Sequence, residues 1–411
     1  MNASDRAPVR LRSPLSVRLE ALRRDAAIVL GDLLGRPPAP FSRRVPLQRH
    51  KDAPLPPSDL LQHRTLVIDR VVRETEDAIS LHLRDPRGAA IAFAPGQFLT
   101  FVVKLPTGQS ARRAYSLSAP PGSGEDASRA RVTVKRIADG KVSGHLHAHA
   151  REGDSVTVLG PSGSFGISAS DARGKHLLLV AGGSGITPLR CVAEAALADE
   201  TVTATLLFGN RGEGDIVFRE ELSALVGRFG GRLVVRHVLE TPPAGWTGGE
   251  GRLDVGAATR EIEAILASDG ARGRVTEALV CGPTPMMEAV REALSRVGVA
   301  PSHVREEQFS SPDQRKKAVV TRAQPVTFLV KGQPHDTVAT PGQTLLEAGL
   351  AAGVKMPFSC GMGGCGACKC KLVSGDVAAE EPNCLSAAES GKGYILTCVS
   401  RAAGPVALEV P

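Results

Sequence analysis

Aromatic side chains are scarce in this sequence. One Trp, two Tyr and eleven Phe make up 3% of its 411 residues, and the first 60 residues contain a single aromatic ring, that of Phe41. Proteins that hold single-stranded nucleic acid stack the bases on aromatic rings. The scarcity therefore speaks against a nucleic-acid partner.

Long apolar runs are also missing. The longest, AAIVLGDLLG from Ala26, is interrupted by Asp32 and is shorter than the roughly 20 residues that a membrane-spanning helix needs. It also begins too far along the chain for a signal peptide. We therefore expect a cytoplasmic protein with reduced thiols. In that setting, clustered cysteines indicate metal ligands rather than disulfides.

Positive charge is distributed unevenly. Residues 1–60 hold eleven Lys or Arg against six Asp or Glu, a difference of +5 out of the whole chain's +7. A basic arm of this kind is either a solvated tail or a contact for an anionic membrane surface or an acidic protein. Peripheral membrane contact through this arm stays open.

The length of 411 residues predicts two to four domains, and the pattern changes along the chain. Apolar residues at spacings of three and four predict an amphipathic helix near the start, before a Pro-rich connector: Leu15, Leu19, Leu22, Ala26, Leu30 and Leu33. Residues 61–170 contain six short β-rich segments separated by Gly and Pro turns, which predict an antiparallel barrel. Residues 171–310 alternate strands with helices, which predicts a doubly wound parallel α/β domain. A polar linker, 311–324, precedes a small domain, 325–411.

The small domain carries a dense cysteine cluster. In CGMGGCGACKC, Cys360, Cys365 and Cys368 give the spacing C-x4-C-x2-C, and Cys398 follows 30 residues later. This is the plant-type [2Fe–2S] spacing, and the loop's glycines allow the tight turns that such a cluster needs. Structural zinc usually takes two short C-x2-4-C pairs, so the spacing favours iron–sulfur over zinc or disulfides.

Three other cysteines look like bystanders. Cys370 follows Cys368 by two residues in an expected strand, and one loop cannot supply a fourth ligand without crowding. Cys191 and Cys384 are interpreted as small buried hydrophobic residues. The domain 325–411 resembles plant-type ferredoxins, which implies a β-grasp fold. It departs from many of them at Gly361, where relatives carry a basic residue.

Two motifs in the barrel segment point to a phosphate-bearing ligand. In RAYSLS, alternation along a strand places Arg113 and Tyr115 on one face and Ser116 on the other. In DGKVSGHL, residues Gly140, Lys141, Val142 and Ser143 stand at an expected helix start, where free N–H groups suit a pyrophosphate.

Two further motifs lie in the α/β segment. In LLLVAGGSGITPLR, Gly182, Gly183 and Gly185 leave a strand and allow close approach to phosphate before a helix from Thr187. In VCGPTPM, Cys281, Gly282 and Pro283 end another strand.

Together these motifs resemble the ferredoxin–NADP reductase superfamily, with a ferredoxin domain at the C-terminus as in phthalate-dioxygenase-reductase-like proteins. The resemblance implies that residues 61–170 bind flavin and 171–310 bind the nicotinamide nucleotide. It implies that Arg113, Lys135 and the 140–143 turn hold phosphate, that Tyr115 lies near the isoalloxazine, and that Ser116 reaches the N5 region. It also implies that Cys281 lies beside the nicotinamide and that Glu307 and Phe309 of EEQF close over the flavin. The pyrophosphate turn favours FAD over FMN.

The nucleotide preference depends on the end of the second strand, in FGNRGEGDIVFREEL. An acid there favours the ribose of NADH, whereas Arg211, with Arg219 nearby, offers cations for a 2′-phosphate. We predict NADPH over NADH, although Glu213 and Asp215 weigh the other way. Three histidines, His145, His147 and His149, are not expected to bind a metal, since that spacing brings at most two rings together.

These expectations combine into one function. The sequence predicts an NAD(P)H-dependent oxidoreductase that passes electrons from NADPH through FAD and a [2Fe–2S] cluster to an external acceptor protein such as an oxygenase, hydroxylase or desaturase. Ser116 and Cys281 are the candidates nearest the reacting atoms, in a positioning role, because the cofactors carry the redox chemistry. The alternative is a flavin and iron–sulfur redox-sensing module without sustained turnover.

Overall fold

The computed structural model describes residues 63–105, 110–122, 126–309, 320–381, 383–385 and 387–411. The expected amphipathic helix and the Pro-rich connector of residues 1–60 lie outside these ranges. Among the described helices, none combines the length and apolar character needed to cross a membrane.

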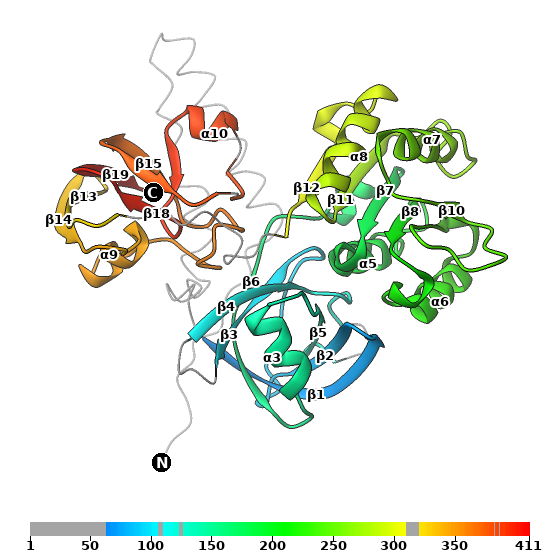
Figure 1. Cartoon of the computed structure of the whole chain (residues 1–411), viewed down its shortest axis with the longest axis horizontal. Helices are drawn as coiled ribbons and strands as arrows, with labels where there is room; N and C mark the ends of the chain where they lie inside the picture. The colour runs from blue at the N-terminus through cyan, green and yellow to red at the C-terminus, as the bar shows by residue number, and fades with distance from the viewer. Residues whose placement is uncertain (1–62, 106–109, 123–125, 310–319, 382, 386) are drawn as a thin grey trace, which may run out of the picture. The chain divides into compact units, whose positions relative to one another are not determined.

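The first described domain is an antiparallel barrel (Figure 1). Its strands, in the order β4-β3-β6-β1-β2-β5, are β1 (Arg64–Thr75), β2 (Ala78–Arg84), β3 (Phe98–Lys104), β4 (Ser110–Ser116), β5 (Arg129–Lys135) and β6 (Ser155–Ser162). A bridge between Leu117 and Val132 joins the two ends of this sheet. Helix α3 (Lys141–His149) packs its buried Val142 and Leu146 into the barrel core. The predicted barrel is confirmed.

The second domain is a parallel sheet covered by helices on both faces. Its strands, in the order β10-β9-β8-β7-β11-β12, are β7 (His176–Gly182), β8 (Thr203–Asn210), β9 (Leu233–Leu239), β10 (Gly249–Glu250), β11 (Thr276–Cys281) and β12 (Val304–Glu307). Its helices are α4 (Ala169–Ala172), α5 (Ile186–Ala196), α6 (Arg219–Phe229), α7 (Val255–Leu266) and α8 (Thr284–Arg296).

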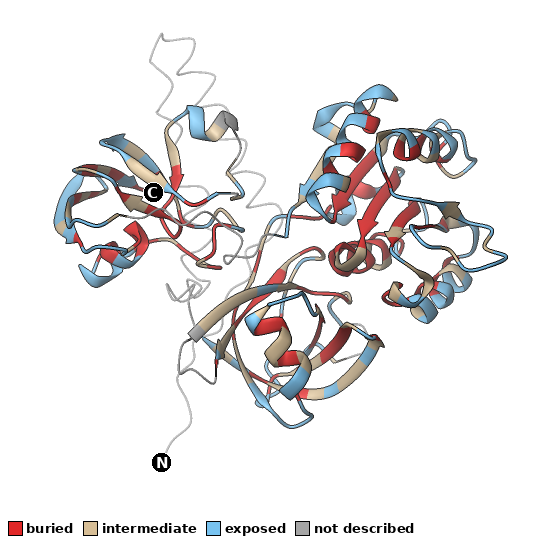
Figure 2. Ribbon diagram, viewed as in Figure 1, coloured by how far each residue is buried: buried red, intermediate tan, exposed pale blue. Residues whose placement is uncertain are grey.

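Alternation along the central strands explains the two layers of helices. In β7, Leu177 and Leu179 pack with α5 and α6, whereas Leu178 and Val180 pack with α7 and α8. A strand covered on both faces reads as a continuous apolar run, which is what LLLV shows. The central strands are accordingly buried, and the helices around them expose their outer sides (Figure 2). The doubly wound prediction is confirmed, and α7 is an element that the sequence pattern did not reveal.

The C-terminal domain is a mixed sheet packed on one helix. The sheet, in the order β14-β13-β19-β15-β17, comprises β13 (Gln324–Val330), β14 (Gln333–Ala339), β15 (Lys369–Ser374), β17 (Tyr394–Leu396) and β19 (Val406–Val410), beside the pair β16 (Val377–Ala379) and β18 (Ser400–Ala402). Its helices are α9 (Leu345–Ala351) and α10 (Ala387–Gly391). Strands β13 and β19 run parallel, and Leu345 and Leu346 of α9 join the core of this domain. This is the expected β-grasp arrangement.

Candidate active site and metal centre

A cavity of about 850 Å³ collects residues from all three domains. Its wall includes Tyr115 of the barrel, Gly183 of the nucleotide domain, and Cys360 of the loop formed by residues 359–368, here called the cysteine loop. Pockets that hold small molecules and cofactors have this size and this mixed lining.

The barrel side of the cavity is built by β4, β5 and the start of α3. Arg113, Tyr115 and Ser116 line it, and so does Lys135. The Tyr115 ring meets Phe101 edge to face, with 5.3 Å between ring centroids, which holds the tyrosine upright against the core.

The turn before α3 also faces the cavity, through Gly140, Val142 and Ser143. A Cβ at Gly140 would stand 2.3 Å from Ser143 Oγ and 2.4 Å from Ile137 Cγ1, so the turn requires glycine. Lys141 is exposed and lines a separate surface pocket with His145 and His149. Of the four residues in the predicted pyrophosphate turn, only Lys141 lies away from the cavity.

The nucleotide loop packs tightly against the end of β11. Gly182, Gly183 and Thr187 line the cavity, whereas Gly185 lies behind it. A Cβ at Gly185 would stand 1.9 Å from the carbonyl oxygen of Cys281, and one at Gly182 would stand 2.6 Å from Pro283 Cδ. Two of the loop's glycines are therefore demanded by the contact between the β7 and β11 turns.

Ser116 and Glu307 meet across the boundary between the barrel and the nucleotide domain. The Ser116 hydroxyl donates to Glu307 Oε2 at 3.4 Å, although 191 residues separate the two in sequence. Burial raises the pKa of Glu307 to about 8, against the opposing effect of this hydrogen bond. The carboxyl group is therefore mostly protonated at neutral pH. Phe309 lines the same wall.

Cys281 itself does not line the cavity. It is fully buried, while the next two residues, Gly282 and Pro283, form the wall. Burial raises the pKa of Cys281 well above its usual value, and the nearby charge of Glu307 adds to the effect. A protonated thiol one layer behind the wall can support the surface but cannot act as a nucleophile.

The cavity wall also contains polar groups that the sequence motifs did not indicate. Asn210, the last residue of β8, is only 7% exposed and lines the cavity. Neither its Oδ1 nor its Nδ2 has a hydrogen-bond partner within the described part of the chain. Buried amides are normally satisfied, so this one fits a ligand with hydroxyl or ring nitrogen groups. The strand-end position before Arg211 was the available signal.

The two guanidinium groups expected to hold a 2′-phosphate differ in position. Arg211 lines the cavity and pairs with Asp215 and, at 3.0 Å, with Asp77 of the barrel. Arg219 is outside the lining and pairs with Glu213. Arg252 also lines the cavity and pairs with Glu240 at 3.0 Å. Asp77, Asp215, Glu240 and Arg252 were not among the predicted site residues.

The cysteine loop is shaped to surround sulfur atoms. Gly361, Gly363 and Gly366 have φ values of +64°, +66° and +71°, a region that favours glycine. The backbone N–H of Met362 donates to Cys360 Sγ at 3.4 Å, and that of Gly363 donates to Cys398 Sγ at 3.1 Å. N–H groups aimed at sulfur stabilise thiolate ligands.

The four predicted ligands form two pairs. Cys368 Sγ lies 3.2 Å from Cys398 Sγ, and a hydrogen bond with Cys365 lowers the pKa of Cys360. No group of three such side chains within the described residues converges on a point suited to one metal ion. Four thiols arranged in two pairs fit the four cysteine ligands of a two-iron cluster.

The remaining cysteines divide. Cys370 is buried in β15, and burial raises its pKa to about 12, which keeps this thiol protonated. Cys191 is buried in α5 as expected. The expectation for Cys384 was wrong, because Cys384 is exposed. Its backbone N–H bonds to the carbonyl of Gly363 at 2.9 Å, so it lies beside the cysteine loop at the surface.

The cysteine loop reaches the barrel through apolar contacts. Phe98 of β3 packs with Cys360 and Met362, and the hydroxyl groups of Ser162 and Ser359 are hydrogen-bonded. Cys360 and Met362 also line the cavity. The place where electrons would leave thus borders the place where a flavin would bind.

Three protein families match the chain, one for each domain. Residues 65–167 match the oxidoreductase FAD-binding domain, residues 179–292 the oxidoreductase NAD-binding domain, and residues 328–403 the 2Fe-2S iron-sulfur cluster binding domain.

Several relatives that match most of the chain are named as reductase components or reductase subunits of monooxygenases. The ferredoxin reductase component of 3-ketosteroid-9-alpha-monooxygenase from Mycolicibacterium smegmatis is 36% identical over 347 residues, which cover 81% of this chain and 92% of that protein. The glycine betaine monooxygenase reductase subunit from Pseudomonas aeruginosa is 29% identical over 356 residues, which cover 83% of this chain and 93% of that protein. The solved structure of phthalate dioxygenase reductase is 27% identical, with a TM-score of 0.56 over 85% of this chain and 98% of that one.

The chain therefore belongs to the family of ferredoxin reductase components that combine FAD-binding, NAD-binding and 2Fe-2S domains. It is an oxidoreductase of the ferredoxin reductase type, with sites for FAD, a pyridine nucleotide and a [2Fe–2S] cluster.

Proposed function

We propose that this chain takes a hydride from NADPH and delivers electrons one at a time, through its cysteine-bound cluster, to an oxygenase-type partner. The observation that carries the proposal is the cavity itself, whose wall unites the flavin strands, the nucleotide loop and the cysteine loop. A flavin supplies the conversion between two-electron and one-electron chemistry, so a flavin in this cavity would be in reach of both neighbours.

The protein's own groups bind, orient and exclude water. Arg113, Lys135 and the N–H groups at the start of α3 would hold the flavin phosphates. Tyr115 and Phe309 would cover ring surfaces, and the nucleotide loop would receive the pyrophosphate of the nucleotide. Ser116 Oγ, held by Glu307, can present its hydroxyl to a flavin edge. We assign Cys281 a supporting role, since it stands one layer behind the wall.

Cys360, Cys365, Cys368 and Cys398 are the ligands that we propose for the cluster. The two sulfur pairs and the N–H groups aimed at them support this assignment. Thiolates are required for iron, and each N–H that points at a sulfur favours the charged form.

NADPH is proposed because two guanidinium groups, those of Arg211 and Arg252, line the cavity, as Asn210 also does. Each is already paired with a carboxylate. A 2′-phosphate must therefore compete with Asp215 and Glu240, and we expect the preference over NADH to be modest.

The nucleotide preference has a direct test. Arg211→Gln should lower the ratio of kcat/KM for NADPH over NADH by about tenfold, which corresponds to the loss of one charge-assisted contact. Asp215→Asn should raise the same ratio. Arg219→Gln is the matched control, because Arg219 does not line the cavity. An unchanged ratio in Arg211→Gln would assign the nucleotide contact elsewhere.

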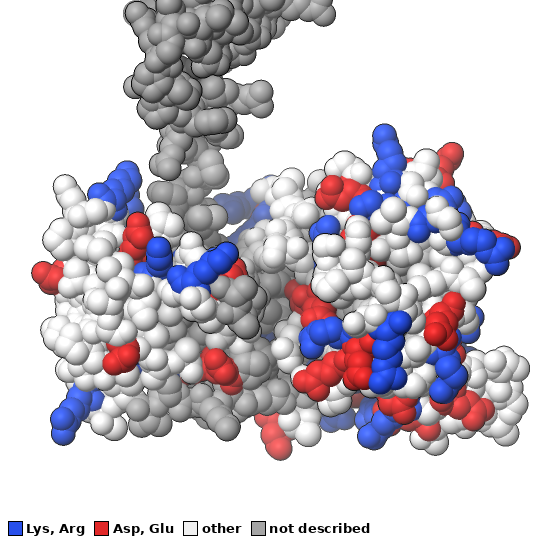
Figure 3. Space-filling model, turned by 90° about the horizontal axis from the view of Figure 1, so that it is seen from above, with Lys and Arg blue, Asp and Glu red and all other residues white. Residues whose placement is uncertain are grey.

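The acceptor is proposed to be the oxygenase, hydroxylase or desaturase component of the same system. The support comes from the relatives, two of which are reductase components of monooxygenases by their names. On the face shown in Figure 3, positive and negative side chains lie interspersed, so this face does not indicate the charge of the partner. Deleting residues 1–60 tests whether the basic arm takes part in docking to the partner or to a membrane.

Sustained turnover separates a reductase from a sensor. The purified protein should oxidise NADPH continuously with ferricyanide or cytochrome c as acceptor. The relatives do not favour the sensor alternative, since they are electron-donating components. A single stoichiometric reduction without turnover would restore it.

A further inference from the structure

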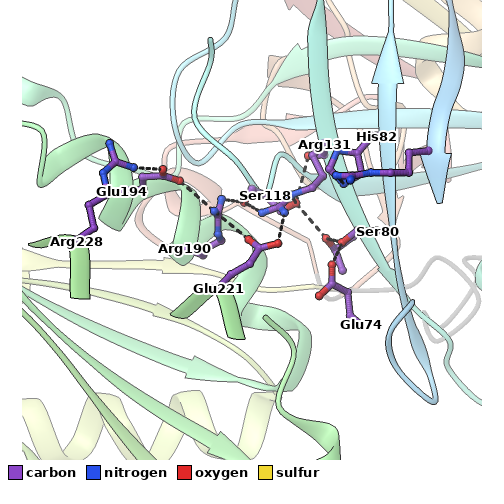
Figure 4. A network of polar contacts seen from close by, with 11 residues as sticks. Glu74, Ser80, His82, Ser118, Arg131, Arg190, Glu194, Glu221 and Arg228 are labelled. Carbon is purple, nitrogen blue, oxygen red and sulfur yellow. Dashed lines mark hydrogen bonds and ion pairs between the residues drawn. The ribbon is translucent and has the colours of Figure 1, made fainter. Parts of the chain in front are cut away.

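A chain of ion pairs crosses from the barrel to the nucleotide domain (Figure 4). Arg131, on β5 of the barrel, donates to Glu221 Oε1 on α6 at 2.7 Å. Arg190, on α5, pairs with Glu221 Oε2 at 3.0 Å. Glu221 is therefore held by two guanidinium groups that come from different domains.

A backbone carbonyl adds a second link. Ser118, just beyond β4, accepts from Arg131 Nη2 at 3.0 Å and from Arg190 Nη1 at 2.8 Å through the same carbonyl oxygen. The Phe218 ring stacks under both cations, with its centroid 4.8 Å from Arg131 Cζ and 5.7 Å from Arg190 Cζ. Stacking of this kind is favourable when the cation is removed from water.

Burial makes these contacts costly to lose. The side chains of Arg131 and Arg190 are only 8% and 9% exposed, whereas that of Glu221 is 38% exposed. A guanidinium group stays charged in a protein and needs a partner when buried. Burial raises the pKa of Glu221, but the hydrogen bond and charge of Arg131 outweigh it. Glu221 is accordingly ionised, and it balances the two cations together with Glu194, whose Oε2 lies 3.1 Å from Arg190 Nη2.

The contacts lie next to both halves of the active site. Ser118 follows Ser116 by two residues, and Ser116 lines the cavity. Arg190 stands one helical turn after Thr187, which also lines the cavity, on the helix that begins just after the nucleotide loop. The same two elements therefore carry the cofactor-facing residues and the ionic contact.

We propose that Arg131, Arg190 and Glu221 form an ionic joint that sets the position of the nucleotide loop relative to the flavin strands, and hence the hydride-transfer geometry. The three are positioning residues, because none of them lines the cavity. The inference rests on the proposed function. Its physical basis is that misplacement of reacting groups by about 1 Å can cost 100-fold in rate, and that Arg–carboxylate pairs fix direction as well as distance.

The test compares Glu221→Gln with Glu220→Gln in the flavin-loaded protein. Glu220 is the exposed neighbour on the same helix, so the two variants make the same chemical change inside and outside the joint. Glu221→Gln should reduce the rate constant for flavin reduction at saturating NADPH about tenfold, with nucleotide Kd changed by less than about threefold. Glu220→Gln should match the unmodified protein in both.

A second readout does not depend on turnover. Hydrogen–deuterium exchange should rise in Glu221→Gln at residues 116–118 and at the start of α5, and should not rise in Glu220→Gln. Arg131→Met should behave like Glu221→Gln, and the double variant should be no slower than the slower single variant, because both changes remove the same contact.

Two results would overturn the joint. The first is a Glu221→Gln variant in which the rate constant for flavin reduction and the hydrogen–deuterium exchange are both unaltered. The second is a Glu221→Gln variant in which only the affinity for the nucleotide is weakened. If Glu221→Gln loses its flavin or unfolds, Arg131→Lys replaces it, since lysine keeps the charge without the forked geometry. An unaltered rate in Arg131→Lys, together with unaltered exchange, would count equally against the joint. Failure of the unmodified protein to be reduced by either nucleotide would contradict the proposed function instead.

Discussion

Around the cavity, the flavin barrel has one boundary with the nucleotide domain and another with the cysteine loop, and the two are built differently. Toward the nucleotide domain the contacts are ionic and directional, as with Arg131 and Glu221. Toward the cysteine loop they are mainly apolar, with Phe98 packed on Cys360 and Met362. Hydride transfer needs reacting atoms in contact and in line, whereas electron transfer to a cluster forms no bond. The boundary with the stricter geometric demand has the directional contacts.

Removal of a cluster ligand should break the electron-exit side completely. Cys398→Ser removes the sulfur that pairs with Cys368 Sγ. We therefore expect loss of the cluster and of cytochrome c reduction. Flavin reduction by NADPH should persist. Visible absorption and electron paramagnetic resonance of the reduced protein measure this. Cys384→Ser is the control, because Cys384 is exposed, and cluster loss there would contradict the ligand assignment.

A change in the nucleotide loop should impair hydride transfer from the nucleotide to the flavin. A methyl group at Gly185 would overlap the Cys281 carbonyl oxygen. Gly185→Ala should therefore displace the loop and slow flavin reduction by about 100-fold, as measured by stopped-flow absorbance. Gly227→Ala in α6, where the new methyl group meets open space, should instead gain up to about 1 kcal/mol of stability. Equal rates for Gly185→Ala and the parent would show that the loop position does not matter.

The Glu307 carboxyl group, at the boundary between the barrel and the nucleotide domain, should make the stability of the protein depend on pH. Its folded pKa of about 8 lies above the ordinary value of 4.5, so its contribution to stability is full below pH 4.5 and is lost as pH rises through 8. Between pH 6 and 9 the parent should therefore lose roughly 2 to 3 kcal/mol of stability relative to the Glu307→Gln variant. Urea unfolding at both pH values checks this. A constant difference between the two proteins would mean that Glu307 ionises normally.

The apolar boundary should be the more tolerant. Met362→Ala should slow cluster reduction by the flavin less than about threefold, or roughly 0.6 kcal/mol, because no bond must be aligned there. Rapid-mixing absorbance of the cluster gives the rate, and a melting curve separates it from unfolding. A tenfold lower rate of cluster reduction in a folded Met362→Ala variant would show that the apolar boundary is as sensitive to substitution as the ionic one.

Local patterns predicted most of this architecture. The short β-rich segments predicted the barrel, and the apolar run LLLV predicted a strand covered on both faces. The cysteine spacing predicted a loop that brings several thiols together. Contacts between distant segments have no local signature, so the pairs Arg131–Glu221 and Arg211–Asp77 were not predicted. Cys384 was placed wrongly for a related reason, because its exposure depends on how residues near it pack on the cysteine loop.

The most direct test of the central claim is an anaerobic absorbance titration with NADPH and, separately, with NADH. We expect flavin absorbance to bleach near one equivalent of NADPH and the broad absorption of the cluster to fall afterwards, with NADH needed at higher concentration. A flavin that bleaches while the cluster stays oxidised would contradict the claim that one cavity couples hydride entry to single-electron exit.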